Sequence, residues 1–345
     1  MRIAIIGYGG VGKALVQLLV DKKHYLKSKS IDIQLNYVIG SRGGIYVPKG
    51  IECNDLAEFS KNEKDITKFI PGGSKEVNFD LVLRNGDVDA IIEMTPTNKE
   101  TGEPGMSHIT RALENKIHVI TSNKGPILLA YKKLNKIAIK NNVQLAIGCT
   151  TGGALPSING GIIDLAGSEI TSIEGVLNGT TNFIINEMEE KACSYYDSLK
   201  KAQQLGIAET DPTLDVEGWD TASKLLILTN VLMNEEKTLK DIKVEGITNL
   251  KSKDVADALK EGKKYKLIGK TTRTVHGLEM NVKLEKLEKE HPLYGVNAKN
   301  KAVRYVSDTL GELTIIGGAS GVTPAAASIL RDLININRGY RYCSN

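Results

Sequence analysis

The beginning of the chain constrains the fold most strongly, because a short apolar run leads directly into a spaced set of glycines. RIAIIGYGGVGKALVQLLVDKK predicts a strand, a G-x-G-x-x-G turn and an amphipathic helix. In such a turn Gly7 allows the tight bend, Gly9 lets the backbone approach a pyrophosphate, and Gly12 lets helix and strand pack closely. The free N–H groups of the first helical turn, at Gly10 and Val11, would face the phosphates. This context predicts a dinucleotide-binding unit.

Further alternation of strands and helices extends this unit into a Rossmann-type, doubly wound parallel sheet. DAIIEMTPT (89–97) predicts a buried strand, and a helix at 106–115 and a strand at 117–121 follow it. We expect 97–106 to be a loop over the cofactor and the acid-rich stretch 52–81 to be a connector. Ligands of such sheets bind at the carboxyl ends of the strands. The residues expected there are Thr95, Pro96, Thr97, Thr121, Asn123 and Lys124.

The end of the second predicted strand, IQLNYVIG (33–40), bears on the choice of cofactor. An NAD site needs an acidic side chain there to bind the ribose 2′-hydroxyl group. This chain has Ser41 and Arg42 instead, and a hydroxyl with a guanidinium suits a 2′-phosphate. We therefore expect NADP(H) in preference to NAD(H). The alternative is that Arg42 is a solvated loop residue and that the protein accepts both cofactors.

Composition excludes several classes of partner. The 345 residues, 41% of them hydrophobic and 25% charged, suit about two globular domains. The net charge of +4 is spread along the chain without basic blocks interleaved with aromatics, so nucleic acid is not expected. The most apolar late stretch, 225–233, is too short to span a membrane. A small molecule is the expected partner.

The cysteines and histidines indicate neither a metal centre nor a disulfide framework. The four cysteines lack CxxC spacing, and the five histidines form no HExxH pair. We therefore expect a reducing, cytoplasmic compartment. Cys343 is expected to be an exposed thiol, with an intersubunit disulfide as the alternative.

An acid-rich segment ahead of a lysine, LGIAETDPTLDVEGWDTASK (205–224), is the strongest candidate for chemistry. A helix is predicted over 216–233, and on it Asp220 and Lys224 are four residues apart and share a face. A partly desolvated lysine can act as acid or base near neutral pH. The alternative is a surface ion pair, which stabilises a helix by only about 0.3–0.5 kcal/mol. Asp211, before a proline, and Glu217, in the first helical turn, fit structural roles.

Several segments in order resemble the homoserine dehydrogenase family. They are TSNKGP (121–126), GGALPSI (152–158), GVLNGTTNFI (175–184), the segment 205–224 and GGASGVTPAAASILRDL (317–333). The resemblance implies the reversible NAD(P)-dependent interconversion of L-homoserine and L-aspartate 4-semialdehyde, in threonine and methionine biosynthesis. A related dehydrogenase of another small amino-acid alcohol or aldehyde, and a nucleotide-sensing paralogue without turnover, are the alternatives.

The resemblance also implies roles for individual residues. Lys124 matches an active-site lysine of the family, and Lys224 and Asp220 are the expected proton-transfer pair. Glu209 and Asp215 match the contacts to the substrate amino group. The Gly-Thr-Thr turn could hold the substrate carboxylate, with ordinary turn chemistry as the alternative; its candidates are Asn178, Gly179 and Thr180. The helix after 317 is implied to begin by the nicotinamide, so Gly318 and Thr323 are further candidates.

The chain departs from the family pattern at one position. Many members carry a glutamate ahead of the G-G-x-x-P turn that helps bind sodium, and this chain has Gly148 there. A sodium or potassium ion would depend on the backbone carbonyls of Thr151 and Ala154. No regulatory domain is expected after residue 345.

The resemblance implies two domains. Residues 1–147 and 313–345 would bind the nucleotide, and residues 148–312 would bind substrate and form the dimer interface. Alternating, β-branched stretches between 271 and 316 predict strands of an open mixed sheet in this second α/β domain. We therefore expect a homodimer.

Overall fold

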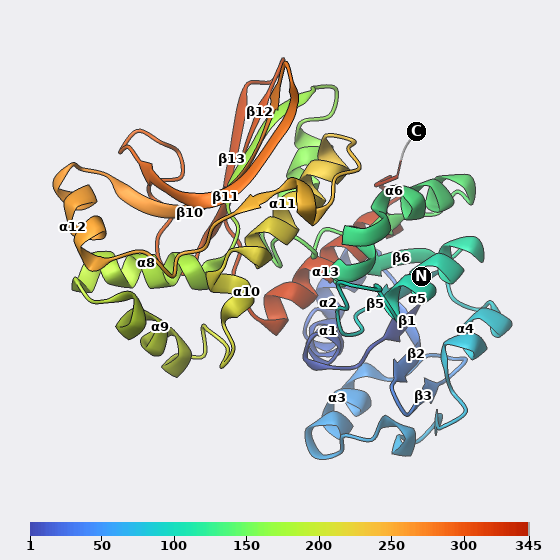
Figure 1. Cartoon of the computed structure of the whole chain (residues 1–345). Coiled ribbons are helices and arrows are strands. Elements are labelled where there is room, and N and C mark those ends of the chain that lie inside the picture. The colour runs from blue at the N-terminus through green and yellow to red at the C-terminus, as the bar shows by residue number, and fades with distance from the viewer. Residues whose placement is uncertain (344–345) are drawn as a thin grey trace. The chain divides into compact units, whose positions relative to one another are not determined.

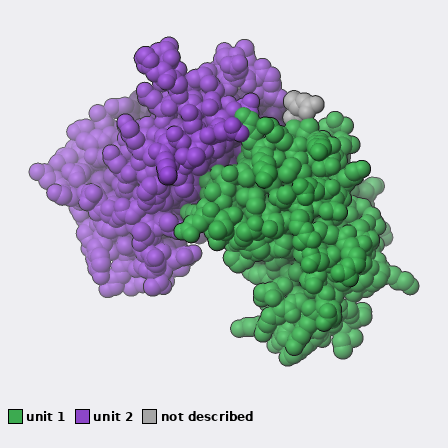
Figure 2. Space-filling model, turned by 45° about the vertical axis from the view of Figure 1, so that its right-hand side comes forward, with its two compact units in different colours: residues 1–154, 321–345 green, residues 155–320 purple. Residues whose placement is uncertain are grey.

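The computed structural model describes residues 1–343, which form two compact units (Figure 1 and Figure 2). The first unit contains residues 1–154 and the chain from Gly321 onward, and the second unit contains Leu155–Ser320. Both breaks fall later than the predicted domain boundaries, and the second one does so because the strand at 312–317 pairs within the second unit. What each unit binds stays a prediction.

Within residues 1–343, the first unit is built on a seven-stranded sheet in which five neighbouring strands are parallel. Two further strands extend one edge in antiparallel pairing. The order is β4 (Gly73–Ser74), β3 (Gly43–Tyr46), β2 (Gln34–Gly40), β1 (Arg2–Ile6), β5 (Ala90–Glu93), β6 (His118–Thr121) and β7 (Leu145–Ala146). The predicted doubly wound parallel sheet is confirmed.

The helices of the first unit come from both ends of the chain. They are α1 (Gly10–Asp21), α2 (Lys23–Ser28), α3 (Cys53–Asn62), η1 (Ile66–Lys68), α4 (Phe79–Asn85), α5 (Gly105–Glu114), α6 (Lys124–Lys140) and α13 (Val322–Asn337). The last helix packs against α1 because Ala326, Ile329 and Leu333 recur at helical spacing and are fully buried. Each such isoleucine or leucine contributes about 1.5–3 kcal/mol through burial.

The predicted elements of this unit appear within a few residues of their expected bounds. The strand predicted at 89–97 is β5 and already ends at Glu93, so Thr95–Thr97 follow the strand as a loop. The stretch 52–81 is more ordered than expected, because it contains α3, η1, β4 and the start of α4. The sequence of α3 has no clear apolar stripe, because Leu56 is its one fully buried side chain.

In the described part of the chain, the second unit contains a six-stranded mixed sheet, as predicted. Its order is β13 (Glu312–Gly317), β12 (Lys301–Ser307), β8 (Ile170–Val176), β10 (Lys264–Thr274), β11 (Gly277–Leu287) and β9 (Lys243–Val244). The accompanying helices are α7 (Ser157–Asn159), the π-helical turn η2 (Gly160–Asp164), α8 (Gly179–Lys191), α9 (Tyr195–Gln204), α10 (Thr213–Val216), α11 (Trp219–Leu232), η3 (Leu239–Asp241) and α12 (Ser252–Lys260).

The two faces of the second sheet differ. On one face α11 packs closely, and the hydroxyls of Thr229 and Thr271 are 2.7 Å apart. On the other face Glu174 of β8 is in register with Lys270 of β10 and Arg304 of β12. Arg304 Nη1 donates to Glu174 Oε2 over 2.8 Å, so charged side chains line this face.

The helix predicted over 216–233 is divided in two, which corrects the sequence-based expectation. α10 ends at Val216, and α11 begins at Trp219. Gly218 has a φ of +85°, a left-handed conformation that L side chains rarely adopt, and it interrupts the helix there. Glu217 is therefore the C-terminal cap of α10 and does not lie in the first turn of a longer helix.

Among residues 1–343, no helix combines the length and the apolar character that a membrane span requires.

Candidate active site

The glycine turn after β1 has the close contacts that the sequence predicted. Gly7 has a φ of +100°, and a Cβ atom there would lie 2.6 Å from the carbonyl carbon of Met94. A Cβ at Gly12 would lie 2.8 Å from the carbonyl oxygen of Gly7. At Gly9 there is open space around the corresponding position. The turn therefore brings the start of α1 close to the end of β1, and it leaves room for a ligand beside Gly9.

A cleft of about 810 Å³ opens at the carboxyl ends of β1, β2 and β5. This is a size typical of small-molecule sites. Six residues predicted to contact the cofactor line it: Gly7, Gly9, Ser41, Arg42, Thr95 and Pro96. The cleft therefore fits a dinucleotide at the sheet edge where parallel sheets bind their ligands.

The stretch 52–81, which the sequence predicted to be a connector, contributes residues to the same cleft. Lys64, Asp65 and Thr67 line it beside Arg42, and Phe79 and His108 line it as well. Thr67 donates two hydrogen bonds to Asp65 Oδ1, and these bonds, with the nearby guanidinium of Arg42, lower the pKa of Asp65. Sequence reasoning missed these residues, because only the pairing of β3 with β2 and β4 brings 64–67 back to the cleft.

Three further candidates meet at the ends of β5 and β6. Asn123 Oδ1 accepts from Gly125 N over 3.1 Å and caps α6, which begins at Lys124. Asn123 Nδ2 donates to the backbone oxygen of Thr95, and Asn123 N donates to Thr121 Oγ1. The structure therefore joins Thr95, Thr121 and Asn123, and it places Thr97 on the exposed loop.

The remaining cofactor candidates are divided between the units. A Cβ at Gly10, in the first turn of α1, would lie 3.1 Å from Val322 Cγ1, so the start of α13 lies beside the glycine turn. Thr323 and Gly10 line the same small cavity of about 440 Å³. Val11 follows within α1 and is half-buried. Gly318 belongs to the second unit, where it packs against Leu155.

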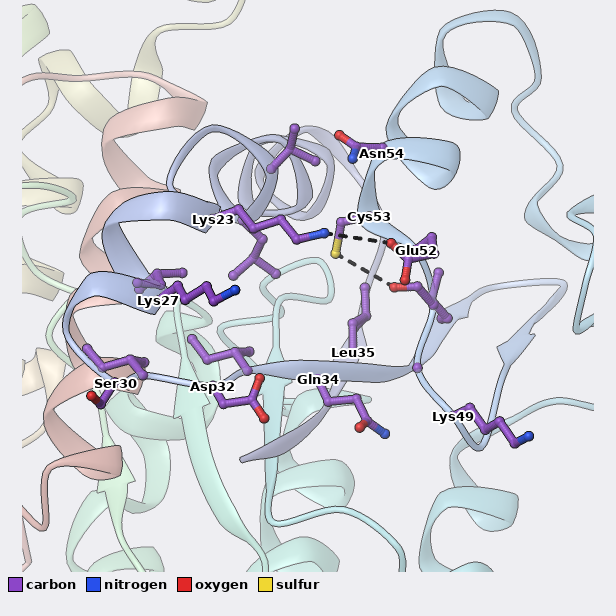
Figure 3. Close-up of a pocket in the computed structure, with 17 residues that line it drawn as sticks. Lys23, Lys27, Ser30, Asp32, Gln34, Leu35, Lys49, Glu52, Cys53 and Asn54 are labelled. Carbon is purple, nitrogen blue, oxygen red and sulfur yellow. Dashed lines mark hydrogen bonds and ion pairs between the residues drawn. The ribbon is translucent and has the colours of Figure 1, made fainter.

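Another cavity, of about 490 Å³, lies at the opposite edge of the first sheet, where β2 begins (Figure 3). Lys23 and Glu52 both line it and point toward each other, with Lys23 Nζ 4.0 Å from Glu52 Oε2. Burial raises the pKa of the Cys53 thiol to about 11, so this sulfur is a poor nucleophile. No predicted site residue lines the cavity, and its edge of the sheet is not the one where such folds bind cofactors.

In the second unit, the lysine of the acid-rich segment pairs with one of its acids, Asp220. Lys224 Nζ lies 2.5 Å from Asp220 Oδ2 and donates to the backbone oxygen of Leu177 over 2.8 Å. The side chains of Lys224 and Asp220 are only 13% and 12% exposed. The pair is therefore not the solvated surface pair of the alternative interpretation. These contacts use two of the three donors of an ammonium group.

Asn178 connects this pair to a second carboxylate. Its side-chain amide donates to Asp215 Oδ1 over 2.7 Å and to Asp220 Oδ2 over 2.9 Å. Its side-chain oxygen accepts from Thr181 N over 2.9 Å and caps α8. The side chain of Asn178 is thus engaged in holding the two acids, a role that the sequence did not indicate.

Two of the other substrate candidates, Gly179 and Thr180, follow Asn178 directly, whereas no contact joins the exposed side chain of Glu209 to this cluster among the described residues. Gly179 begins α8, and Thr180 Oγ1 donates to the backbone oxygen of Ile207 over 3.1 Å. This bond fixes the start of the exposed loop that carries Glu209. Asp211 Oδ1 accepts two hydrogen bonds from Thr213, which confirms it as a turn residue.

The region proposed to hold a monovalent cation follows β7. Thr151 is buried there, Ala154 is half-buried, and Gly148 N donates to the buried carboxylate of Asp332 over 3.0 Å. Position 148 offers no side-chain ligand. In the described residues, no group of three or more His, Cys, Asp or Glu side chains is placed to hold a metal ion.

The expectation for Cys343 is wrong, because its thiol is buried. Tyr342 N and Cys343 N both donate to Gln144 Oε1, and Leu145 N donates to Cys343 Sγ. The end of the described chain is therefore hydrogen-bonded to Gln144 and to Leu145 of β7. Burial raises the pKa of the Cys343 thiol to about 11. Cys149 is buried, as expected for a small core residue.

Comparisons with known proteins agree with the resemblance. The family model described as homoserine dehydrogenase matches residues 156–334. A homoserine dehydrogenase from Methanocaldococcus jannaschii is 38% identical over 97% of this chain and 98% of its own. An NAD(+)-dependent homoserine dehydrogenase from Pseudomonas canavaninivorans is 34% identical over 98% of this chain and 96% of its own.

A solved structure agrees as well. The crystal structure of a putative homoserine dehydrogenase from Archaeoglobus fulgidus has a TM-score of 0.86 and 31% identity, and the match covers 97% of this chain and 99% of that one. Together with the family model and the two relatives, this match extends the likeness over both units. The chain belongs to the homoserine dehydrogenase family, a family of oxidoreductases of amino-acid biosynthesis.

Proposed function

We propose that this oxidoreductase interconverts L-homoserine and L-aspartate 4-semialdehyde, as a step toward threonine and methionine, with NADP(H) in preference to NAD(H). A bound nicotinamide supplies the hydride acceptor or donor for this chemistry. The observation that carries the proposal is the cluster of Lys224, Asp220, Asn178 and Asp215. A lysine held among carboxylates suits a substrate that has both a reacting hydroxyl group and an ammonium group.

The proton step is assigned to Lys224. Its contacts to Asp220 and to the oxygen of Leu177 leave one donor position for a substrate oxygen. In the oxidative direction the Lys224 amine accepts the hydroxyl proton, and in the reductive direction its ammonium group returns a proton to the aldehyde oxygen. Asp220 orients the amine and balances its positive charge.

Binding of the amino acid is assigned to the groups around that lysine. Asp215 uses one oxygen to accept from Asn178, so its second oxygen can accept from the substrate ammonium. Glu209 is proposed as the second carboxylate for that ammonium. Gly179 and Thr180 have the free N–H groups of the first turn of α8, which suit the substrate carboxylate. Lys124, at the start of α6, is proposed to assist at the carboxylate or in the proton step.

The preference for NADP(H) is supported by Ser41, Arg42 and Lys64 at one end of the cleft. Their hydroxyl and positive charges suit a 2′-phosphate. NAD(H) is the second candidate, because Asp65 lines the same end of the cleft and its carboxylate could accept from a 2′-hydroxyl group. A relative of this chain is named as NAD(+)-dependent.

Three further features are part of the proposal. A homodimer is proposed through the charged face of the second sheet around Glu174, and sedimentation of the pure protein tests it. A reducing, cytoplasmic setting is proposed, because the four cysteines are free thiols. A monovalent cation is proposed to bind the carbonyls of Thr151 and Ala154, and no step of the reaction is assigned to it.

A spectrophotometric assay at 340 nm tests the reaction. L-homoserine is supplied with NADP+ or NAD+, and L-serine and 5-hydroxy-L-norvaline serve as the shorter and longer analogues. We expect turnover of homoserine far above that of both analogues. Faster turnover of an analogue would indicate a related dehydrogenase with another substrate. Cofactor binding without turnover of any of the three would indicate a nucleotide sensor.

A further inference from the structure

We propose that Glu93, the last residue of β5, is a positioning residue that holds two cofactor loops together. The proposal concerns the loop after β5, with Thr95, and the loop after β6, with Asn123, which leaves the strand at Thr121, its last residue. It rests on the proposed function, since it assumes that these loops bind the nicotinamide half of the dinucleotide. Glu93 itself is fully buried and is not offered as a group that touches the cofactor.

The carboxylate of Glu93 accepts from the loop after β5 and from the last residue of β6. Its Oε1 accepts from Thr95 N over 3.0 Å and from the Thr95 hydroxyl. Its Oε2 lies 3.2 Å from Thr121 Oγ1, and it shares that hydroxyl proton with the backbone oxygen of Glu93, which is 3.0 Å from the same atom. A buried carboxylate is stabilised only when such donors replace the water that it has lost. Pairing of β5 with β6 already places Glu93 beside Thr121, and the carboxylate adds a link from this strand end to the loop that carries Thr95.

Further contacts link Thr121 and Thr95 to the neighbouring parts of the proposed cofactor site. Thr121 Oγ1 accepts from Asn123 N over 3.0 Å, and Asn123 caps the helix that begins at Lys124. On the other side, a Cβ at Gly7 would lie 2.8 Å from Thr95 N, so the glycine turn packs against the loop after β5. Three segments proposed to hold the cofactor thus meet around one carboxylate.

The side of Glu93 toward α5 is closely packed. A Cβ atom at Gly105 would lie 3.2 Å from Glu93 Oε2 and 2.6 Å from Asn123 Nδ2. His108, which lines the cofactor cleft, has its Nδ1 3.8 Å from Glu93 Oε1. Glu93 therefore lies directly beneath the lining of the cleft, which is where a positioning residue can act on a bound ligand.

A glutamine cannot serve both loops in the same way. Its amide offers one acceptor oxygen and one donor nitrogen and has no negative charge. If the oxygen of Glu93→Gln serves Thr95, the Thr121 hydroxyl can donate only to the backbone oxygen of residue 93, and the link between the two segments is weakened. The size of the side chain is kept, and we expect the protein to fold. We expect the loops to lose their fixed spacing, and the loss to affect the nicotinamide half of the dinucleotide more than the adenosine half.

The test compares two ligands by isothermal titration calorimetry. NADP+ is one, and 2′-phospho-ADP-ribose, which lacks the nicotinamide, is the other. For Glu93→Gln we expect the Kd of NADP+ to rise about tenfold, which corresponds to about 1.4 kcal/mol, while the Kd of 2′-phospho-ADP-ribose changes less than about twofold. With saturating cofactor we expect kcat to fall as well, because the ring is less well oriented.

Two further variants make the test decisive. Thr121→Val removes one donor to the same carboxylate and should show the same selective loss if Glu93→Gln is poorly folded. Tyr37→Phe removes a buried hydroxyl that donates to Asp87 over 2.8 Å, elsewhere in the first unit, and should leave both Kd values unchanged. Equal weakening of both ligands, or unchanged NADP+ binding in a folded variant, would overturn the inference. If the unmodified protein bound neither ligand, the proposed function itself would fail.

Discussion

The two candidate regions of this molecule are constructed in opposite ways. The glycine turn of the first unit is made of backbone, and its positions Gly7 and Gly12 are five residues apart in the sequence. The lysine cluster of the second unit is made of side chains, and Lys224 bonds to an oxygen 47 residues away, that of Leu177. A backbone site is specified by local spacing, whereas a side-chain site depends on long-range packing. The two should therefore fail in different ways when they are altered.

The largest effect is expected at the side-chain region. Lys224→Ala removes the proposed proton carrier and should lower kcat by about 10³-fold or more, a loss typical of general acid–base groups. Lys224→Arg should be similarly impaired, because a guanidinium keeps its charge and does not release its proton. NADP+ binding should stay within about twofold, since the change lies in the second unit. Steady-state kinetics and calorimetry measure the two quantities.

Lys200→Ala, which changes an exposed lysine of α9, is the matched control and should retain normal kcat. A Lys224→Ala enzyme with near-normal turnover would remove this residue from the mechanism. A Lys224→Ala protein that had also lost cofactor binding would show that the two regions are not separable.

The second largest effect is expected at the backbone region. Gly7→Ala places a methyl group 2.6 Å from Met94 and forces a left-handed φ on alanine. The two penalties together cost about 3 kcal/mol, so cofactor affinity or stability should fall by about 100-fold. Gly86→Ala is the matched control, because Gly86 also has a positive φ of +59° but open space around it. Calorimetry and thermal unfolding distinguish crowding from strain. If the two variants behaved alike, crowding against the loop after β5 would be unimportant.

The same contrast explains what the sequence could predict. The doubly wound sheet and the glycine turn follow from patterns that span fewer than about 30 residues, and the structure has both. The pairing of Asp220 with Lys224 was predictable because residues four apart share a helix face, and their atoms are 2.5 Å apart. Gly218 is a possible helix break that can be recognised in the sequence, but the apolar pattern around it favours one continuous helix.

What the sequence could not provide depends on contacts between distant segments. Asn178 holds Asp215 and Asp220 across 37 and 42 residues, and no local pattern contains that pairing. Glu93 ends an apolar strand, where a single acid gives no sign that a loop and a neighbouring strand end will donate to it. Cys343 was expected to be exposed because it lies near the end of the chain, and Gln144 draws that end into the first unit.

A smaller effect is expected from the carboxylate proposed to bind the substrate. Asp215→Asn keeps an oxygen for Asn178 and removes the negative charge for the substrate ammonium. Losing one charged hydrogen bond costs about 1.5–3 kcal/mol, so the KM for homoserine should rise by about 10–100-fold. The kcat should change much less, because binding and not proton transfer is affected. Asp211→Asn, in the exposed turn, should leave both constants unchanged. A lower kcat with an unchanged KM would instead place Asp215 in the chemical step.

The smallest effect is expected at Arg42, one of the side chains proposed to determine the choice of cofactor. Arg42 lines the cleft beside Ser41, Lys64 and Asp65, and under the proposed function it would share the recognition of a 2′-phosphate with Ser41 and Lys64. Arg42→Ala should therefore weaken NADP+ by only about tenfold, or about 1.4 kcal/mol, and leave NAD+ nearly unchanged.

Arg84→Ala, on the exposed part of α4, is the control, and calorimetry with both dinucleotides measures the selectivity. The loss for NADP+ should shrink as salt is raised, because an exposed guanidinium–phosphate contact is screened. An equal loss for NAD+ and NADP+ would mean that Arg42 contacts a group common to both. In that case Arg42, like the glycine turn in its proposed role, would contact features that NAD+ and NADP+ share. Asp65 would then become the candidate for discrimination between the two dinucleotides.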